Sequence, residues 1–332
     1  VRADIASWNG APALRVAGKP VFPLWFWERE VSPENAAAFR EAGVDVFTFC
    51  STDYYLYPGW TGENRYDYTE FDRIVLELLD KNPDALCIPR IFVGAPAWWL
   101  DLHPEEACGF ANGKGWEENG WGGTKHESFA SECWRRDAGE ALRRFIRHIE
   151  TSPYGGRVIG IHVCNGIYGE WHTWSATDLP DTGEPMRRAF GDWLRVRYAG
   201  DTDALRRAWG DPEASFDRPA MPGVAERHAG DVGMFRDPAR SRKAADYYEC
   251  LHRVTVDAMD HFCGIVKEAS DGRMLTCVFY SYAPDLDWPQ EGDHRAAALA
   301  HRLKSVDIFS SPHAYLRRQL ARRYQDKRLY RP

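Results

Sequence analysis

The stretch VIGIHVCNGIYGEWH, residues 158–172, joins an apolar run to a polar and aromatic ending. Residues 158–163 are almost continuously apolar, which is typical of a strand buried on both faces in a parallel sheet. Polar side chains, among them Asn165 and Glu170, follow where such a strand would end. The stretch therefore predicts an α/β fold whose functional groups stand at the carboxyl ends of the strands.

Further apolar runs on either side repeat this pattern and predict strands at 21–27, 44–49, 86–93, 274–280 and 306–309. Amphipathic stretches predict helices at 32–42, 68–81, 130–150, 184–198, 201–209, 239–269 and 292–304, with one more from about residue 316. The alternation favours a parallel sheet. An open doubly wound sheet is disfavoured because no Gly-rich phosphate turn follows the first run. We therefore predict a TIM (β/α)8 barrel.

These apolar runs supply about six of the eight βα units that a closed barrel needs. Residues 1–20 are expected to form an N-terminal hairpin or lead-in, and residues 21–332 the barrel. A long helical insertion follows the fourth strand, at about 175–270. Because an open six-stranded fragment would expose two apolar edges, we expect the barrel to be completed beyond residue 332.

Charge and cysteine patterns exclude several classes of function. The net charge is −7 and no basic face is concentrated enough for nucleic acid. No apolar run approaches the roughly 20 residues of a membrane span, and residues 1–20 lack a signal-like core, so we expect a cytoplasmic protein without a membrane partner. No cofactor is expected. The histidines and the eight cysteines show no metal-binding spacing, which leaves a chance cluster of His103, Cys108 and Cys133 as the one alternative to no metal.

Aromatic residues make up 14% of the chain, with 14 tryptophans, many of them in loop-like positions. Sugar rings present flat apolar faces that stack on aromatic rings, while their hydroxyls need polar partners. The composition therefore indicates either a carbohydrate site or a large aromatic core.

Glycosidase chemistry needs two carboxyl groups, an acid and a second group about 5 Å away in retaining enzymes. Glu170 is the first candidate for the acid/base, because aromatic neighbours favour a protonated carboxyl. A solvated loop glutamate is the alternative. The predicted substrate contacts all follow or lie within predicted strands or their loops: Trp27, Glu28, Asp53, Arg90, Trp98, His162, Asn165, Trp171, Tyr280, His313 and Tyr315. Arg90 could equally form a structural ion pair, and His162 could be an interior histidine.

The fourth run and the helical insertion together resemble glycoside hydrolase family 42, the β-galactosidases. The resemblance is carried by FGDWLRVRY at 190–198 and LRRAWG at 205–210, in order and at family-like spacing. It implies a retaining exo-acting glycosidase on carbohydrate substrates, with the acid/base after strand four and the nucleophile after strand seven. Relatives that form trimers make a homo-oligomer plausible.

Two departures from the family pattern matter. The family has Asn-Glu at the end of strand four, whereas this chain has Asn165-Gly166, so the proton donor is lost or moved; Glu170 could reach back. The nucleophile strand would fall beyond Pro332. These departures keep two other functions open: a catalytically inactive carbohydrate-binding barrel, and a barrel enzyme of unrelated chemistry such as a lyase or isomerase.

Overall fold

The computed structural model of the protein describes residues 1–21, 24–51, 55–118, 123–175, 178–231, 236–281 and 294–311. Each of the six predicted runs contains parallel strand: β4 (Trp25–Glu28), β5 (Val46–Phe49), β8 (Leu86–Cys87), β9 (Arg90–Phe92), β10 (Gly160–Cys164), β11 (Leu275–Phe279) and β12 (Ile308–Ser310). One sheet has the order β4-β5-β8 and another the order β9-β10-β11-β12. All pairs in these two sheets are parallel, as expected for an α/β fold.

The run at 86–93 forms two strands because Pro89 has no N–H to donate to the ladder. Strand β8 pairs with β5, β9 pairs with β10, and a bridge between Cys87 and Val158 links the two sheets. One interrupted strand therefore serves both sheets. The described strands do not close into a barrel. The completion beyond residue 332 stays a prediction.

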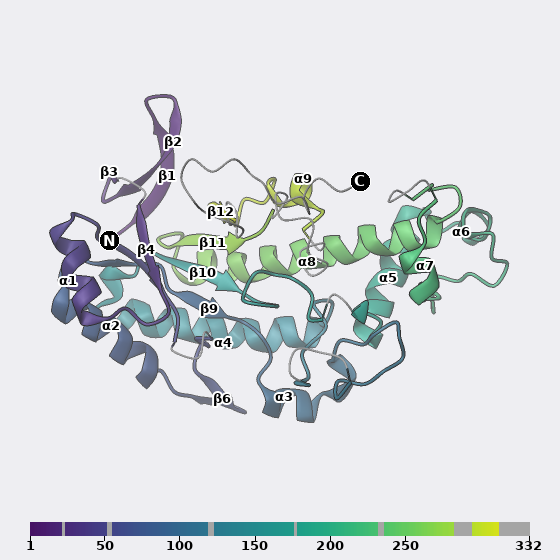
Figure 1. Ribbon diagram of the computed structural model, residues 1–332, viewed down its shortest axis with the longest axis horizontal. Helices are drawn as coiled ribbons and strands as arrows, with labels where there is room; N and C mark the ends of the chain where they lie inside the picture. The colour runs from purple at the N-terminus through teal and green to yellow at the C-terminus, as the bar shows by residue number, and fades with distance from the viewer. Residues whose placement is uncertain are drawn as a thin grey trace, which may run out of the picture.

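An antiparallel unit at the N-terminus covers the starting ends of the parallel strands. It consists of β1 (Ala3–Trp8), β2 (Ala11–Val16) and β3 (Lys19–Val21), and it projects from the sheets in Figure 1. Ala3, Leu14 and Val16 share an apolar cluster with residues at the starts of the parallel strands: Trp25, Val46, Leu86, Ile88, Ile159, Leu275 and Ile308. The opposite, carboxyl ends of the strands are left for the loops that carry the candidate site.

The predicted helices form with small shifts at their ends: α1 (Pro33–Glu41), α2 (Thr69–Lys81), α4 (Glu132–Thr151), α5 (Glu184–Arg197), α6 (Thr202–Trp209) and α8 (Arg242–Ala269). The side chain of Ser32 caps α1 by accepting a hydrogen bond from the N–H of Asn35. In place of the helix predicted at 292–304, the structure has only the short helix α9 (Ala297–Ala300), and the chain turns immediately after it. The helix predicted from residue 316 lies outside the described residues.

Several short elements lie where loops were expected. The long segment at 94–128 contains α3 (Ala97–Leu102) and the 3₁₀ turn η1 (Pro104–Glu106). The segment after β5 contains the hairpin of β6 (Trp60–Gly62) and β7 (Arg65–Tyr66), and α7 (Val224–His228) precedes α8. Helix α3 forms because Trp99 and Leu100 are buried, although six residues are too few to show a helical period.

Helix α8 connects the strands to the helical insertion, as Figure 1 shows. Its 28 residues span roughly 42 Å at 1.5 Å per residue. Near its end, Phe262 packs on Trp134 of α4, whereas near its start Tyr247 packs on Phe190 of α5. The last turns of α8 therefore belong to the layer around the sheet, and the first turns anchor the insertion. None of the described helices is long and apolar enough to span a membrane.

The two motifs quoted above for the insertion converge on one buried carboxylate. Asp246 in α8 accepts hydrogen bonds from Oη of Tyr198, at 2.6 Å, and from Nε1 of Trp209, at 2.9 Å. Nη2 of Arg242 lies 2.7 Å from its other oxygen. The motifs therefore hold α5 and α6 against α8, which is a structural role.

Candidate active site

A tight turn follows β10 at the carboxyl ends of the strands. Ile167 and His172 bridge across it, and Gly166 adopts a φ of +72°. A Cβ added at Gly166 would lie 2.2 Å from the carbonyl oxygen of His172. This backbone therefore excludes any side chain at the position where the resemblance expects a glutamate.

Glu170 lies in the same turn and is 6% exposed. Its Oε2 is 3.7 Å from Nε2 of His172, and its carbonyl oxygen accepts a 2.6 Å hydrogen bond from Nε2 of His294. The two imidazole rings stack with centroids 4.0 Å apart. Burial lowers the pKa of His172 to about 3, so this ring is neutral near pH 7 and its contact with Glu170 is not an ion pair. Two neutral histidines thus fix the candidate acid.

Glu127 is a second buried carboxyl group, and the sequence analysis missed it. It is 1% exposed; its Oε1 accepts a 2.7 Å hydrogen bond from Nδ2 of Asn165, and its Oε2 accepts one of 3.0 Å from the N–H of Ala95. Burial raises the pKa of Glu127 to about 7, although the hydrogen bond from Asn165 acts against this rise. A carboxyl that is partly protonated near neutral pH is suited to proton transfer.

The side chains inside the parallel strands form a cationic and aromatic layer below the turn. Arg90 lies with its guanidinium carbon 5.5 Å from the ring of Trp27 and 5.0 Å from that of Phe279, and its Nη2 donates to the carbonyl of Tyr168 at 2.6 Å. The ring of His162 is 4.3 Å from that of Phe279. Burial, aided by the charge of Arg90, lowers the pKa of His162 far enough to keep it neutral. The turn after β10 therefore rests on interior side chains.

Gly169 allows this close approach. Its φ is +78°, and a Cβ there would lie 3.0 Å from Nη2 of Arg90 and 2.8 Å from the ring of Phe92. Two glycines thus let the turn fold inward over the strands.

The other residues that were predicted to contact substrate differ in burial and in hydrogen bonding. The carboxylate of Glu28 accepts hydrogen bonds from Ser32 and Asn35 at the start of α1. Trp171 is fully buried, with its Nε1 donating to the carbonyl of Val163. The ring of Trp98 meets that of Trp60 edge-on at 5.1 Å, the ring of Tyr280 lies 4.3 Å from that of His294, and Trp27 is 41% exposed. Asp53, His313 and Tyr315 lie outside the described residues.

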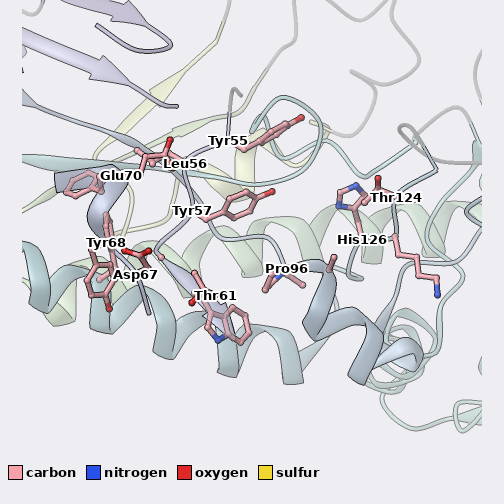
Figure 2. A pocket seen from close by; sticks show the side chains of 17 residues that line it. Tyr55, Leu56, Tyr57, Thr61, Asp67, Tyr68, Glu70, Pro96, Thr124 and His126 are labelled. Atoms are coloured by element: carbon pink, nitrogen blue, oxygen red, sulfur yellow. The ribbon is translucent and has the colours of Figure 1, made fainter. Parts of the chain in front are cut away.

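A cavity of about 470 Å³ opens between the segment after β5 and the segment after β9. Figure 2 shows Tyr57 pointing across it towards His126. Its lining is largely aromatic and polar: Tyr55, Tyr57, Trp60, Asp67, Tyr68, Glu70, Phe71, Thr124, Lys125, His126 and Phe145, together with Leu56, Gly59, Thr61, Ala95, Pro96 and Ala97. Such a lining suits a molecule with apolar ring faces and many hydroxyls.

The cavity is adjacent to the Glu127–Asn165 pair. Ala95, which lines the cavity, donates its N–H to Glu127, and His126 precedes Glu127 in the chain. The His126 ring stacks on Trp174 with centroids 3.5 Å apart, and burial lowers its pKa to about 3. Where it lines the cavity beside the buried carboxyl, the ring of His126 is therefore neutral near pH 7 and stacked on Trp174.

Solved structures with a similar fold include three enzymes whose names refer to carbohydrate substrates. The β-galactosidase of the psychrophilic Marinomonas ef1 has a TM-score of 0.58 and 18% identity, over 88% of this chain and 40% of that one. The β-galactosidase of Bacillus circulans sp. alkalophilus has a TM-score of 0.59 and 16% identity, over 90% and 41%. The catalytic domain of the β-amylase of Paenibacillus polymyxa has a TM-score of 0.65 and 12% identity, over 86% and 75%.

At these identities the likeness shows the fold, which is an α/β fold of the TIM-barrel type. The chain spans about two-fifths of the length of the two β-galactosidases. No curated protein matches it. The model of the Glyco_hydro_42 family, described as beta-galactosidase, matches residues 25–327, which confirms the resemblance in the sequence: the chain belongs to glycoside hydrolase family 42.

Proposed function

We propose that the chain forms the barrel part of a retaining, exo-acting glycosidase of the β-galactosidase kind. The observation that carries the proposal is the aromatic cavity of about 470 Å³ beside the buried pair of Glu127 and Asn165. Aromatic rings and polar groups at the carboxyl ends of the strands are suited to a sugar, and a buried carboxyl is suited to the proton transfer that its hydrolysis requires. Family membership supports the same conclusion.

In this proposal Glu170 is the acid/base. It protonates the glycosidic oxygen as the bond to the anomeric carbon breaks and a carboxylate nucleophile attacks that carbon. Glu170 then accepts a proton from the water that releases the sugar from the nucleophile. The nucleophile belongs to the polypeptide beyond residue 332, where the family pattern implies it.

Asn165 is proposed to contact a sugar hydroxyl. Its Nδ2 is engaged by Glu127, while its Oδ1 has no hydrogen-bond partner among the described residues. An orphaned buried acceptor is costly, and a hydroxyl donor from substrate would satisfy it. Glu127 is then a positioning residue, because it fixes which amide atom of Asn165 is held and which is available.

The test uses the full-length natural protein and aryl β-galactosides with good and poor leaving groups. Glu170→Gln should lower kcat by roughly 10²- to 10⁴-fold for a poor leaving group, and much less for an activated one that needs no protonation. Glu118→Gln, an exposed glutamate in the segment before α4, is the matched control and should leave kcat unchanged. Equal rates for wild type and Glu170→Gln on both substrates would remove Glu170 from the mechanism.

A second candidate function is a carbohydrate-binding barrel without catalysis. The observation that favours it is Gly166, whose backbone excludes the family's glutamate. Calorimetry with galactosides separates the two: binding with no turnover in the full-length protein supports the second function, whereas hydrolysis supports the first. A homo-oligomer and a cytoplasmic location stay predictions, to be measured by light scattering and cell fractionation.

A further inference from the structure

Three side chains with metal-binding atoms come together where the end of α3 meets the first turns of α4. Cys133 and Asp137 are one turn apart on α4, and His103 caps the end of α3. Their ligand atoms all lie within 4.8 Å of one another, and Sγ of Cys133 is 3.9 Å from Oδ2 of Asp137. The chance cluster considered from the sequence contained Cys108; in the described structure Asp137 takes that place.

We propose that His103, Cys133 and Asp137 bind one zinc ion, with water in the fourth position. Zinc takes nitrogen, thiolate and carboxylate ligands in a tetrahedron, with bonds of about 2.0–2.3 Å, so neighbouring ligand atoms stand roughly 3.3–3.6 Å apart. The ligand atoms lie within 4.8 Å of one another, so their separations exceed these values by about 1.5 Å at most, which side-chain rotation can close. A mixed set of nitrogen, sulfur and oxygen atoms favours zinc over calcium or magnesium.

Trp99 orients two of the three ligands. Its Nε1 donates a 3.0 Å hydrogen bond to Oδ2 of Asp137, and its ring lies 4.4 Å from that of His103. Trp99 is itself fully buried, so the ring cannot move far. Fixed partners behind the ligands are what distinguish a built metal site from a chance meeting of side chains.

Arg136 competes for the same atoms. Its Nε donates to Oδ1 of Asp137 at 2.7 Å and its Nη2 to Sγ of Cys133 at 3.2 Å. Its side chain is 70% exposed, so the guanidinium can turn to water when a divalent ion arrives. The carboxylate of Asp137 and the sulfur of Cys133 thus already hold one cationic group between them.

The site would tie α3 to α4 at the base of the segment that carries Ala95, His126 and Glu127. Its role is to hold this segment, and it takes no part in the proposed hydrolysis. The inference is therefore independent of the proposed function.

The experiment titrates ZnCl₂ into the reduced full-length protein by calorimetry, with cobalt as a spectroscopic probe. We expect one ion per chain and a thiolate-to-cobalt charge-transfer band. Cys133→Ser should abolish the band, and His103→Ala and Asp137→Asn should each weaken zinc binding at least tenfold. Cys108→Ser is the matched control and should keep both band and affinity, while Arg136→Ala should tighten binding.

Two results would overturn the proposal. One is wild-type protein that binds no zinc above the level of the Cys133→Ser variant. The other is a cobalt band that survives Cys133→Ser or disappears with Cys108→Ser. A wild-type protein that gives no thiolate-to-cobalt band would also overturn it, and this outcome does not depend on how any variant folds.

Discussion

Nδ2 of Asn165 donates a hydrogen bond to Oε1 of Glu127 across 2.7 Å, joining the end of β10 to a segment 38 residues earlier in the chain. Both residues are almost completely buried. The pair connects the strand that carries the family's site with the wall of the aromatic cavity through Ala95. This hydrogen bond therefore holds the end of β10 at a fixed position relative to the cavity wall.

The titration of Glu127 should appear in the stability of the protein. Burial raises its pKa from 4.5 to about 7, so the folded state binds the proton more tightly than the unfolded state. This contribution is fully present below pH 4.5 and is lost as the pH rises to about 7, by roughly 3 kcal/mol at most. Urea unfolding from pH 4.5 to 8 should show the loss in wild type but not in Glu127→Gln. The prediction is wrong if the free energy of unfolding changes with pH equally in wild type and Glu127→Gln. Glu118→Gln, at an exposed glutamate, is the control and should behave as wild type.

Restoring the family's glutamate should damage the fold. Gly166→Glu places a Cβ 2.2 Å from a backbone carbonyl at a φ of +72°, and we expect a loss of about 3 kcal/mol or more in the free energy of unfolding. Gly113 has a φ of +71° with nothing within 4 Å of an added Cβ. Gly113→Glu should therefore cost only about 1–2 kcal/mol, from backbone strain alone. Equal urea midpoints for the two variants would show that the turn can rearrange cheaply.

The hydrogen bonds to Asp246 should make the two family motifs act as a unit. Tyr198→Phe and Trp209→Phe each remove one donor to a buried carboxylate, and each should cost about 1–3 kcal/mol. A double-mutant cycle measured by urea unfolding should show coupling, because both donors share one acceptor. Trp193→Phe changes a residue of the same motif that makes no hydrogen bond to Asp246 among the described contacts. Its effect on the free energy of unfolding should add to that of Tyr198→Phe without coupling.

The aromatic cavity should bind sugar through Trp60. Trp60→Ala removes a ring that lines the cavity and meets Trp98 edge-on at 5.1 Å. The Kd or KM for a galactoside should rise by about three- to tenfold, as expected for the loss of one aromatic contact. Trp8 lies on the N-terminal hairpin and is 53% exposed, so Trp8→Ala is the control and should change neither the Kd nor the KM. An unchanged Kd in Trp60→Ala would place the sugar elsewhere on the strand ends.

The strands could be predicted because their signal is local. Each apolar run at 21–27, 44–49, 86–93, 158–163, 274–280 and 306–309 contains a parallel strand, since a strand buried on both faces has few polar residues to obscure it. Pro89 was also visible in the sequence, but its consequence, a strand split between two sheets, depends on which neighbours it pairs with. The neighbours with which a strand pairs cannot be predicted from one apolar run alone.

Glu127 could not be found in the same way. It lies in a segment without periodicity, and its importance depends on a path of the chain that brings it to Asn165. Glu170 could be selected because it follows a strand directly, although the histidine that holds its carbonyl, His294, is far away in the sequence. Local patterns thus located the strand ends, while the partners that define the site come from distant segments. The absence of a glutamate at 166 was the sequence signal that the turn after β10 departs from the family pattern.

The conformation of Gly166 also limits which single substitutions this turn can accept. Because the His172 carbonyl lies where a Cβ would stand, a glutamate introduced alone at position 166 meets a steric barrier. A turn with a glutamate there would need Gly166, Gly169 and the bridge from Ile167 to His172 to change together. Placing an acid at this strand end by engineering therefore means redesigning the backbone before choosing the side chain.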